Sequence, residues 1–464
     1  MTDFAALLQP DRGQPARLLH LVTRAEFDAW LGATPPRVRA AVEAGRFTGA
    51  ADTTLILPGE QPEEWSVAVG VDEADGPWRL AAAAAALPAG TYRVEGAPGE
   101  GALGWLLAQH RFTRYRQSPE PAAPRVLLTS EPARIDAVLR LAEATALVRD
   151  LVDTPAGDLG PAELAAAVEA VGQRHGAAIT VTEGDALARD YPMIHAVGRA
   201  ASAPRAPRLV ELQWGDPSHP RLAIVGKGVC FDTGGLDIKP SAGMLLMKKD
   251  MGGAATALAL AGLVMGARLP VRLHLLIPAV ENAISADAFR PGDVLSSRKG
   301  LHVEIGNTDA EGRLILADAL ARACEERPAL LLDFATLTGA ARVALGPDLP
   351  ALFANDDALA DAMLSGGTAV GDPLWRLPLW KPYLDMMKSD VADINNAGAG
   401  GFAGSVTAAL FLQRFVAEDV AWAHLDTFSW RPSAKPGRPK GGDALGLRAT
   451  WAALCARFGE GRIS

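Results

Sequence analysis

The chain has 464 residues, and its 45 lysines and arginines against 54 aspartates and glutamates give a formal net charge of −9. Hydrophobic residues make up 49% of it and charged residues 21%, which is typical of a globular protein and excludes a disordered, collagen-like or disulfide-rich chain. The length predicts two or three domains, or one large catalytic domain with a smaller companion. The acidic balance disfavours nucleic acid as a main partner, because polyanion binding depends on an excess of lysine and arginine.

The cysteines and the uncharged stretches bear on the compartment. Three cysteines at unrelated spacings indicate neither a disulfide framework nor a thiolate metal site, and the first residues lack the basic and apolar regions of a secretory signal. Of two long uncharged stretches, 251–267 is shorter than the roughly 20 residues that span a bilayer, and 394–413 is interrupted by asparagines and glycines. The sequence therefore predicts a cytoplasmic protein without a membrane span.

The N-terminal part alternates short apolar runs with helix-like stretches, which predicts a small α/β domain. Three prolines in Ser118–Pro124 cannot continue a helix and favour an extended linker. Apolar residues near 3.6 spacing then predict a long helix over 132–152. We therefore expect an N-terminal domain over 1–124, a linker helix within 125–155 and a catalytic domain over 156–464. The alternative is that the proline-rich segment is a loop within one domain.

From Arg208 onward, apolar runs of strand length alternate with helical patterns. The alternating strands and helices, in chain order, are Leu222–Val225, Gly252–Met265, Val271–Ala279, Leu314–Cys324, Leu330–Phe334, Val406–Val416 and Ala421–Leu425. Continuous apolar strands separated by helices indicate a mixed, mainly parallel sheet covered by helices on both faces, so the predicted fold class is α/β. Ligands of such sheets bind at the carboxyl ends of the strands.

Acidic and basic side chains crowd these predicted strand ends. They are Lys227, Asp232, Asp237 and Lys239 in a glycine-rich turn, Asp250 before a helix, and Asp309, Glu311 and Arg313 after the strand at 302–305. Residues two apart in an extended loop lie on the same side, so the last three can face one site together. Several carboxylates in one pocket repel one another, so either some hold protons or cations bind them.

Counting charges favours cations. Two divalent ions balance the four carboxylates of Asp232, Asp250, Asp309 and Glu311, and paired ions bridged by carboxylates are typical of hydrolases. Oxygen ligands alone suit magnesium or manganese, whereas a nitrogen ligand shifts the preference toward zinc, cobalt or manganese. No histidines have the spacing of a histidine-built zinc site, and His424 is interpreted as a structural residue at the end of a strand.

These segments resemble the leucyl aminopeptidase family of dinuclear metallopeptidases. The hallmark N-T-D-A-E-G-R-L stands unbroken at Asn307–Leu314. The other matching segments, in family order, are Asp150–Pro155, Val225–Pro240, Met247–Ala255, Glu281–Asn282, Pro291–Val294, Thr336–Ala340 and Ala423–Asp426. The resemblance implies a small macro-like N-terminal domain, a catalytic C-terminal domain, a homohexamer, and peptides with a free N-terminus as substrates.

The resemblance also implies a role for each charged residue. Lys227, Asp232, Asp250 and Glu311 would hold one manganese or zinc ion, and Asp232, Asp309 and Glu311 the other. The Lys227 amine would have to be deprotonated to act as a ligand. Lys239 would polarise the scissile carbonyl, and Arg313 would hold a bicarbonate ion that acts as the general base. Asp237 is interpreted as a turn residue rather than a ligand.

The pocket for the first residue of the substrate is implied in the same way. Its expected substrate-binding residues are Met247, Asn307, Thr336, Leu337, Gly339 and Phe428. The apolar members suit leucine-like or smaller apolar side chains. Phe428 departs from the family pattern, in which an aliphatic residue and then two small residues follow the A-H-L-D segment. Its ring would narrow the pocket, unless it packs away from it.

Two other functions remain open at this point. One is a noncatalytic assembly or regulatory protein on the same fold, which the complete set of predicted ligands disfavours. The other is an additional DNA-binding role, which the net charge disfavours. The basic, proline-rich run at 431–440 is interpreted as a solvated loop, with a lip that receives the substrate's carboxylate side as the alternative.

Overall fold

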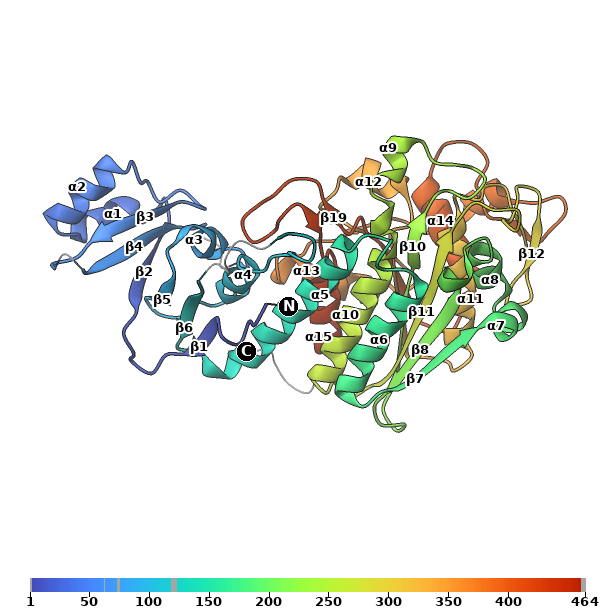
Figure 1. The fold of residues 1–464 in the computed structure, drawn as a ribbon, viewed down its shortest axis with the longest axis horizontal. Helices are drawn as coiled ribbons and strands as arrows, with labels where there is room; N and C mark the ends of the chain where they lie inside the picture. The colour runs from blue at the N-terminus through green and yellow to red at the C-terminus, as the bar shows by residue number, and fades with distance from the viewer. Residues whose placement is uncertain (1, 62, 73–75, 118–122, 460–464) are drawn as a thin grey trace. The chain divides into compact units, whose positions relative to one another are not determined.

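The computed structural model describes residues 2–61, 63–72, 76–117 and 123–459 (Figure 1). It divides into two compact units, one made of Met1–Ala146 with Ser433–Lys440 and the other of Leu147–Pro432 with Gly441–Ser464. Most of the expected linker, 118–122, lies outside the described residues. The domain boundaries expected at 124 and 155 therefore stay predictions.

The first unit is built on a six-stranded sheet with helices against it. In spatial order its strands are β1 (Leu8–Pro10), β6 (Arg125–Thr129), β5 (Gly90–Val94), β2 (Arg17–Val22), β4 (Trp65–Gly70) and β3 (Thr54–Pro58). Neighbouring strands are parallel except β4 and β3. The helices are α1 (Phe27–Ala33), α2 (Pro36–Ala44), α3 (Ala81–Ala86) and α4 (Gly101–Leu107). This is the small α/β fold that the alternation of patterns predicts.

Helix α5 (Ile135–Asp153) is the long helix predicted at 132–152, and one 3₁₀ turn (Pro132–Arg134) precedes it. The N-terminal part of α5 packs Val138, Ala142 and Ala146 into the apolar core of the first unit. Spacing of about 3.6 residues places these three side chains on one face, which explains both the pattern and the helix.

The second unit contains a mixed sheet whose central strands are parallel, as predicted. In spatial order the strands are β16 (Trp375–Arg376), β15 (Ala351–Ala354), β18 (Trp422–Asp426), β14 (Leu330–Ala335), β9 (Arg221–Gly226), β11 (Arg272–Asn282), β8 (Arg208–Trp214) and β7 (Ala178–Glu183), with β10 (Gly228–Asp232) paired to β11. Leu222–Val225 in β9 is fully buried. A central parallel strand covered on both faces has this continuous apolar run.

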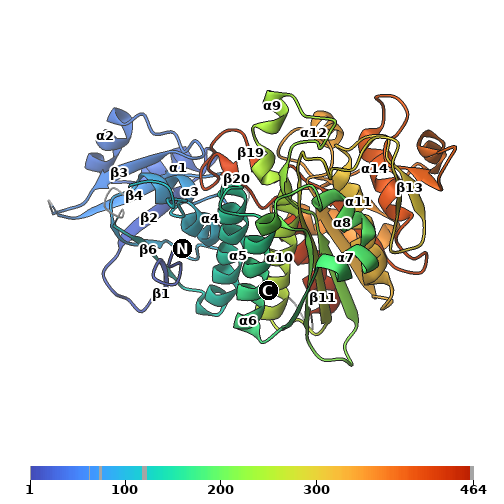
Figure 2. The same cartoon turned by 45° about the vertical axis from the view of Figure 1, so that its right-hand side comes forward.

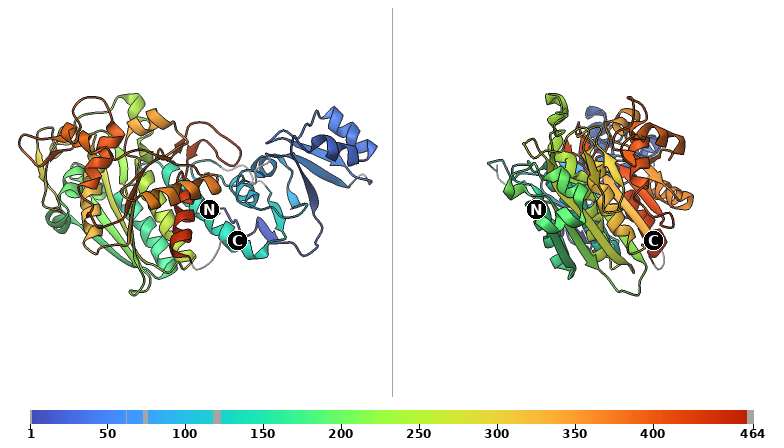
Figure 3. Two further views of the ribbon diagram at one scale, coloured as in Figure 1. Left: turned by 180° about the vertical axis from the view of Figure 1, so that it is seen from behind. Right: turned by 90° about the vertical axis from the view of Figure 1, so that its right-hand side faces the viewer.

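Helices cover both faces of this sheet (Figures 2 and 3). One face carries α6 (Pro161–His175), α10 (Gly252–Gly266) and α15 (Leu447–Phe458), and the other carries α8 (Pro192–Gly198), α11 (Glu311–Cys324) and α14 (Gly404–Gln413). The uncharged stretch 251–267 is thus helix α10, buried against the sheet. Among the described residues, no helix is long and apolar enough to cross a membrane.

Short elements complete the second unit. They are α7 (Gly184–Asp190), α9 (Ser241–Met244), η3 (Met247–Met251), β12 (Val294–Ser296), β13 (His302–Glu304), α12 (Gly339–Leu345), α13 (Asp357–Ala369), η4 (Lys381–Met387), β17 (Ile394–Asn395), β19 (Trp430–Arg431) and β20 (Gly441–Gly442).

Buried Asp318 in α11 connects two other segments of this unit to the helix. Its carboxylate accepts hydrogen bonds from the backbone N–H groups of Met193 (2.9 Å), Ile194 (3.3 Å) and Arg298 (2.8 Å). Met193 and Ile194 lie in the first turn of α8, where backbone N–H groups have no acceptor within the helix.

We expect Asp318→Ala to lower the free energy of unfolding by at least about 2 kcal/mol, because it leaves the two buried N–H groups of Met193 and Ile194 and the partly buried one of Arg298 without acceptors. Denaturant unfolding followed by circular dichroism measures this change. Exposed Asp361 in α13 provides the matched control, and Asp361→Ala should leave stability almost unchanged. Equal stabilities of the two variants would contradict this role of Asp318.

Candidate metal centre and active site

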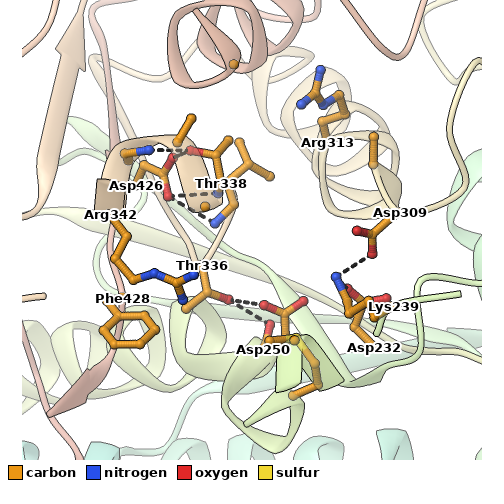
Figure 4. Close-up of a pocket in the computed structure, with 18 of the residues that line it drawn as sticks. Asp232, Lys239, Asp250, Asp309, Arg313, Thr336, Thr338, Arg342, Asp426 and Phe428 are labelled. Atoms are coloured by element: carbon orange, nitrogen blue, oxygen red, sulfur yellow. Dashed lines mark hydrogen bonds and ion pairs between the residues drawn. The ribbon is translucent and has the colours of Figure 1, made fainter. Parts of the chain in front are cut away.

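A cavity of about 520 Å³ lies in the second unit, and the ends of several of its strands contribute side chains to the lining. Lys227 follows β9, Asp232 ends β10 and Thr336 follows β14. Every site residue predicted from the sequence lines this cavity: Lys227, Asp232, Lys239, Met247, Asp250, Asn307, Asp309, Glu311, Arg313, Thr336, Leu337, Gly339 and Phe428. Figure 4 labels several of them, among them Asp232, Lys239 and Asp309. Segments far apart in the sequence therefore meet at one place.

Two lysines separate the four carboxylates. The Lys227 Nζ lies 2.6 Å from Asp250 Oδ2 and 3.0 Å from Glu311 Oε1. The Lys239 Nζ lies 2.7 Å from Asp232 Oδ2 and also pairs with Asp309 Oδ1. Each ammonium therefore bridges two carboxylates, and both lie between groups that would otherwise repel one another.

Three of the carboxylates could converge on one ion. One oxygen each of Asp232, Asp309 and Glu311 lies within 4.8 Å of the others. Glu311 is buried, and its Oε2 accepts no hydrogen bond from any described residue. A buried carboxylate oxygen without a donor is costly unless a cation binds it. Together with the Lys227 nitrogen, these oxygens fit the ligand preferences of manganese or zinc.

Burial and neighbouring charges shift the pKa values of the carboxyl groups in the cluster. Burial, with repulsion by Asp232, raises the pKa of Glu311 to about 8. The same two causes raise the pKa of Asp309 to about 6. Burial also acts on Asp250, but the ammonium groups of Lys227 and Lys249 outweigh it and lower its pKa to about 2. Glu311 therefore keeps its proton at neutral pH even though the Lys227 ammonium lies 3.0 Å away.

The pKa values of Lys227 and Lys239 are both raised, whereas an amine that binds a metal ion needs a lowered pKa. Burial lowers the pKa of Lys227, but the carboxylates of Asp250 and Glu311 outweigh it and raise the pKa above its usual value. The pKa of Lys239 is raised similarly, chiefly by Asp232. Both amines are therefore protonated among the protein's own groups. Lys227 can serve as a nitrogen ligand only if cations offset these carboxylates.

The absence of a side chain at Gly312 leaves room for the Lys227 amine beside the carboxylates. A Cβ placed on Gly312 would lie only 2.7 Å from the Lys227 Nζ. Any larger residue at the second position of α11 would therefore push the amine away from Glu311. This close approach gives a physical reason for glycine in the A-E-G-R segment.

Asn282, Thr308 and Asp237 support the acidic loops. The Asn282 Nδ2 donates hydrogen bonds to Asp232 Oδ1 (2.9 Å) and to the Thr308 carbonyl (3.1 Å). Asp237 Oδ2 accepts from the Thr308 N–H (2.7 Å), which joins the two loops. Asp237 thus lies in a turn and binds a neighbouring loop. In the sequence, Asn282 belongs to a segment that matches the family, but no pattern there predicted its hydrogen bond to Asp232.

Arg313 lines the cavity and is held by a hydrogen bond at one end. Its Nη1 donates to the Asn396 carbonyl (2.7 Å), and its Nε has no acceptor among the described residues. The Asn396 Oδ1 accepts from the N–H groups of Gly306 and Asn307, which connects it to the same loop. Burial lowers the pKa of Arg313 to about 10, so it stays charged at neutral pH. Nothing in the sequence around Asn396 indicated this contact.

Asp426 organises the wall formed by Thr336–Gly339. Asp426 Oδ1 accepts from the N–H groups of Leu337 (3.0 Å) and Thr338 (3.2 Å), and its Oδ2 accepts from the Thr338 hydroxyl (2.6 Å). The Thr336 hydroxyl donates to Asp250 Oδ1 (2.7 Å), so this wall also contacts the carboxylate cluster. His424 is fully buried in β18 beside Asp333, in agreement with its structural interpretation.

The basic run at 431–440 begins with a buried residue rather than a solvated one. Arg431 is 3% exposed and pairs with Asp443 (2.7 Å) and Asp348 (2.8 Å). Asp443 also pairs with Arg149 (3.4 Å). The expectation of a solvated loop is therefore wrong for Arg431, because two carboxylates compensate the burial of its charge.

Comparisons with known proteins identify the family of this chain. The model of the cytosol aminopeptidase family, catalytic domain, matches residues 146–450, and the model of the M17 aminopeptidase N-terminal domain matches 18–128. A probable cytosol aminopeptidase of Geobacter sp. strain M21 is 39% identical over 463 residues, which cover 91% of this chain and 92% of that protein. A probable cytosol aminopeptidase of Syntrophotalea carbinolica is 41% identical over 74% of this chain and 72% of its own length.

Solved structures show the same fold. The crystal structure of cytosol aminopeptidase from Coxiella burnetii has a TM-score of 0.92 and 44% identity, and the match covers 97% of this chain and 99% of that one. The bottromycin maturation enzyme BotP in complex with Mn has a TM-score of 0.86 and 33% identity over 95% of this chain and 99% of its own. The chain therefore belongs to the cytosol aminopeptidase family and is a metal-dependent aminopeptidase that acts on peptides.

Proposed function

We propose that the enzyme removes the first residue of peptides with two divalent ions, manganese or zinc, held by the carboxylate cluster. Lys227, Asp232, Asp250 and Glu311 would hold one ion, and Asp232, Asp309 and Glu311 the other. The observation that supports this most is the convergence of Asp232, Asp309 and Glu311 within 4.8 Å, with a buried Glu311 oxygen that has no donor among the described residues. The Mn complex of the similar enzyme BotP favours manganese.

The chain's own residues would orient the substrate and stabilise charge. Bound ions would lower the pKa of a water that attacks the scissile carbonyl and polarise its oxygen. The Lys239 ammonium, with its raised pKa, would donate to that oxygen and stabilise the negative charge that develops there. Only an N-terminal residue brings a free amine to the carboxylate cluster, which would make the activity that of an exopeptidase.

Arg313 would hold a bicarbonate ion that receives the proton of the attacking water. The supporting observation is a buried, charged guanidinium in the cavity wall whose Nε has no acceptor among the described residues. A planar guanidinium binds an oxyanion with two parallel hydrogen bonds, which a lysine cannot do.

The remaining expectations belong to the same proposal. The pocket formed by Met247, Asn307, Thr336, Leu337, Gly339 and Phe428 would accept leucine-like or smaller apolar first residues. The homohexamer and the division at 124 and 155 follow from the family resemblance and the sequence pattern. The cytoplasmic location agrees with the names of the relatives, which are cytosol aminopeptidases.

We expect chelation with EDTA to abolish hydrolysis of leucyl amides, and manganese or zinc to restore it, because the ions activate the water. Release of a fluorescent amine measures the rate. N-acetyl-leucyl amide, which lacks the free amine, serves as the control and should not be cleaved. A metal-loaded enzyme that cleaves no unblocked substrate would favour the noncatalytic alternative instead.

We expect manganese to bind more tightly as the pH rises from 6 to 8, with release of protons. The pKa of Glu311 is raised to about 8 and that of Asp309 to about 6, so both carboxyls lose protons in this range as cations replace them. Calorimetric titration in buffers of different ionisation enthalpy counts the protons. A titration at pH 9, where Glu311 is already ionised, should release fewer. An affinity independent of pH would contradict the proposed ligands.

We expect Phe428→Ala to increase the preference for leucyl over alanyl amides by about five- to a hundredfold, since removing the ring relieves an overfilling that costs about 1 to 3 kcal/mol. The ratio of the two kcat/KM values measures the effect. Phe458→Ala, at a ring that does not line the cavity, is the matched control. If the ratio is unchanged, the ring does not narrow the pocket.

A further inference from the structure

One wall of the cavity is cationic. The guanidinium carbon of Arg342 lies 4.8 Å from the centre of the Phe428 ring, and the Lys249 Nζ lies 5.5 Å from it. All three residues line the cavity, and Figure 4 shows Arg342 above the ring of Phe428. We call Lys249, Arg342 and Phe428 the cationic wall. A guanidinium over an aromatic face is attracted by the ring, which fixes its position.

The two cations differ in what they bind. The Lys249 Nζ lies 3.3 Å from Asp250 Oδ1, so its charge is already matched. Arg342 forms no ion pair or side-chain hydrogen bond with any residue that the structure describes, and its side chain contacts the Phe428 ring. Its side chain therefore lines the cavity with no acceptor among the described residues.

The carboxylates of Asp250 and Asp426, which line the same cavity as Arg342, already have other hydrogen-bond and ion-pair partners. Asp250 lies between Lys227 (2.6 Å) and Lys249 (3.3 Å), and the Thr336 hydroxyl also donates to it. Asp426 accepts three hydrogen bonds from Leu337 and Thr338. Neither carboxylate is left to neutralise Arg342, so this side of the cavity keeps an uncompensated positive charge.

Arg342 also lies next to the pocket proposed for the first residue. A Cβ placed on Gly339 would lie 3.9 Å from the Arg342 Nη2, because the two residues are one turn apart in α12. Leu337 and Met247 line the same cavity, so a side chain beside Gly339 has apolar neighbours as well as the guanidinium. Such a side chain has methylene groups and ends in a negatively charged group.

We propose that the enzyme also accepts peptides whose first residue is acidic, and that Arg342 binds the carboxylate of that side chain. This inference rests on the proposed function, since it places the first residue beside Thr336–Gly339. The planar fork of arginine fits a carboxylate with two hydrogen bonds, and Phe428 keeps it in place. The C-terminal carboxylate of a short peptide has the same chemistry, so substrates without that group are needed to separate the two.

The test compares glutamyl and glutaminyl 7-amino-4-methylcoumarin amides with the manganese-loaded enzyme. The two substrates have the same shape, differ in one charge, and lack a C-terminal carboxylate. A charge-assisted hydrogen bond corresponds to about 10- to 100-fold in binding, so we expect kcat/KM for the glutamyl amide to exceed that for the glutaminyl amide by at least about tenfold. Arg342→Gln should bring the ratio to one or below, and Arg342→Lys should keep part of it.

Arg174→Gln is the matched control, because Arg174 also lies in the last turn of a helix but outside the cavity, and it should keep the wild-type ratio. If the wild-type enzyme does not favour glutamyl over glutaminyl amide, or Arg342→Gln keeps the preference, the inference is wrong. Should leucyl, glutaminyl and glutamyl amides all remain uncleaved, the proposed function itself fails.

Discussion

Repulsion between buried carboxylates is the constraint on which the rest of the site depends. Asp232, Asp250 and Glu311 are each at most 2% exposed, and such charges are destabilising unless opposite charges lie beside them. Lys227 and Lys239 supply two of these charges, yet Glu311 still has a pKa of about 8. The protein's own groups thus leave the cluster short of positive charge. This deficit favours divalent cations, and the family is metal-dependent.

The fold makes this unfavourable cluster possible because rigid, strongly apolar elements carry its members. β9 leads to Lys227, and α11 begins with Glu311, and both elements are buried almost throughout. Hydrogen bonds from loop to loop then fix the acidic turns, as Asn282 does for Asp232. The free energy gained by packing these elements offsets the cost of holding like charges together.

Much of the site could be predicted from the sequence, since its members lie in short segments with local signals. Lys227 follows β9 and Asp232 ends β10, so their meeting at the carboxyl ends of parallel strands follows from the fold class. Asp309 and Glu311 instead follow β13, which lies in a separate three-stranded sheet, and only the sequence motif indicated that they join the site. Contacts between distant segments had no local signal. The Asn396 carbonyl accepts a hydrogen bond from Arg313, 83 residues away in the sequence. Arg342 could be recognised as part of the cavity wall only from its contact with the ring of Phe428. The burial of Arg431 was mispredicted for the same reason, because its partners Asp348 and Asp443 are set by tertiary structure.

Equilibrium dialysis against manganese, followed by elemental analysis, tests the central claim most directly. We predict two ions per chain at saturation. Asp232→Asn should reduce the content to one ion or none, since this residue would contribute to both sites, whereas Asp250→Asn and Asp309→Asn should each weaken a different single site. One ion per chain at saturation, or full loading of Asp232→Asn, would contradict the claim that paired cations neutralise this cluster.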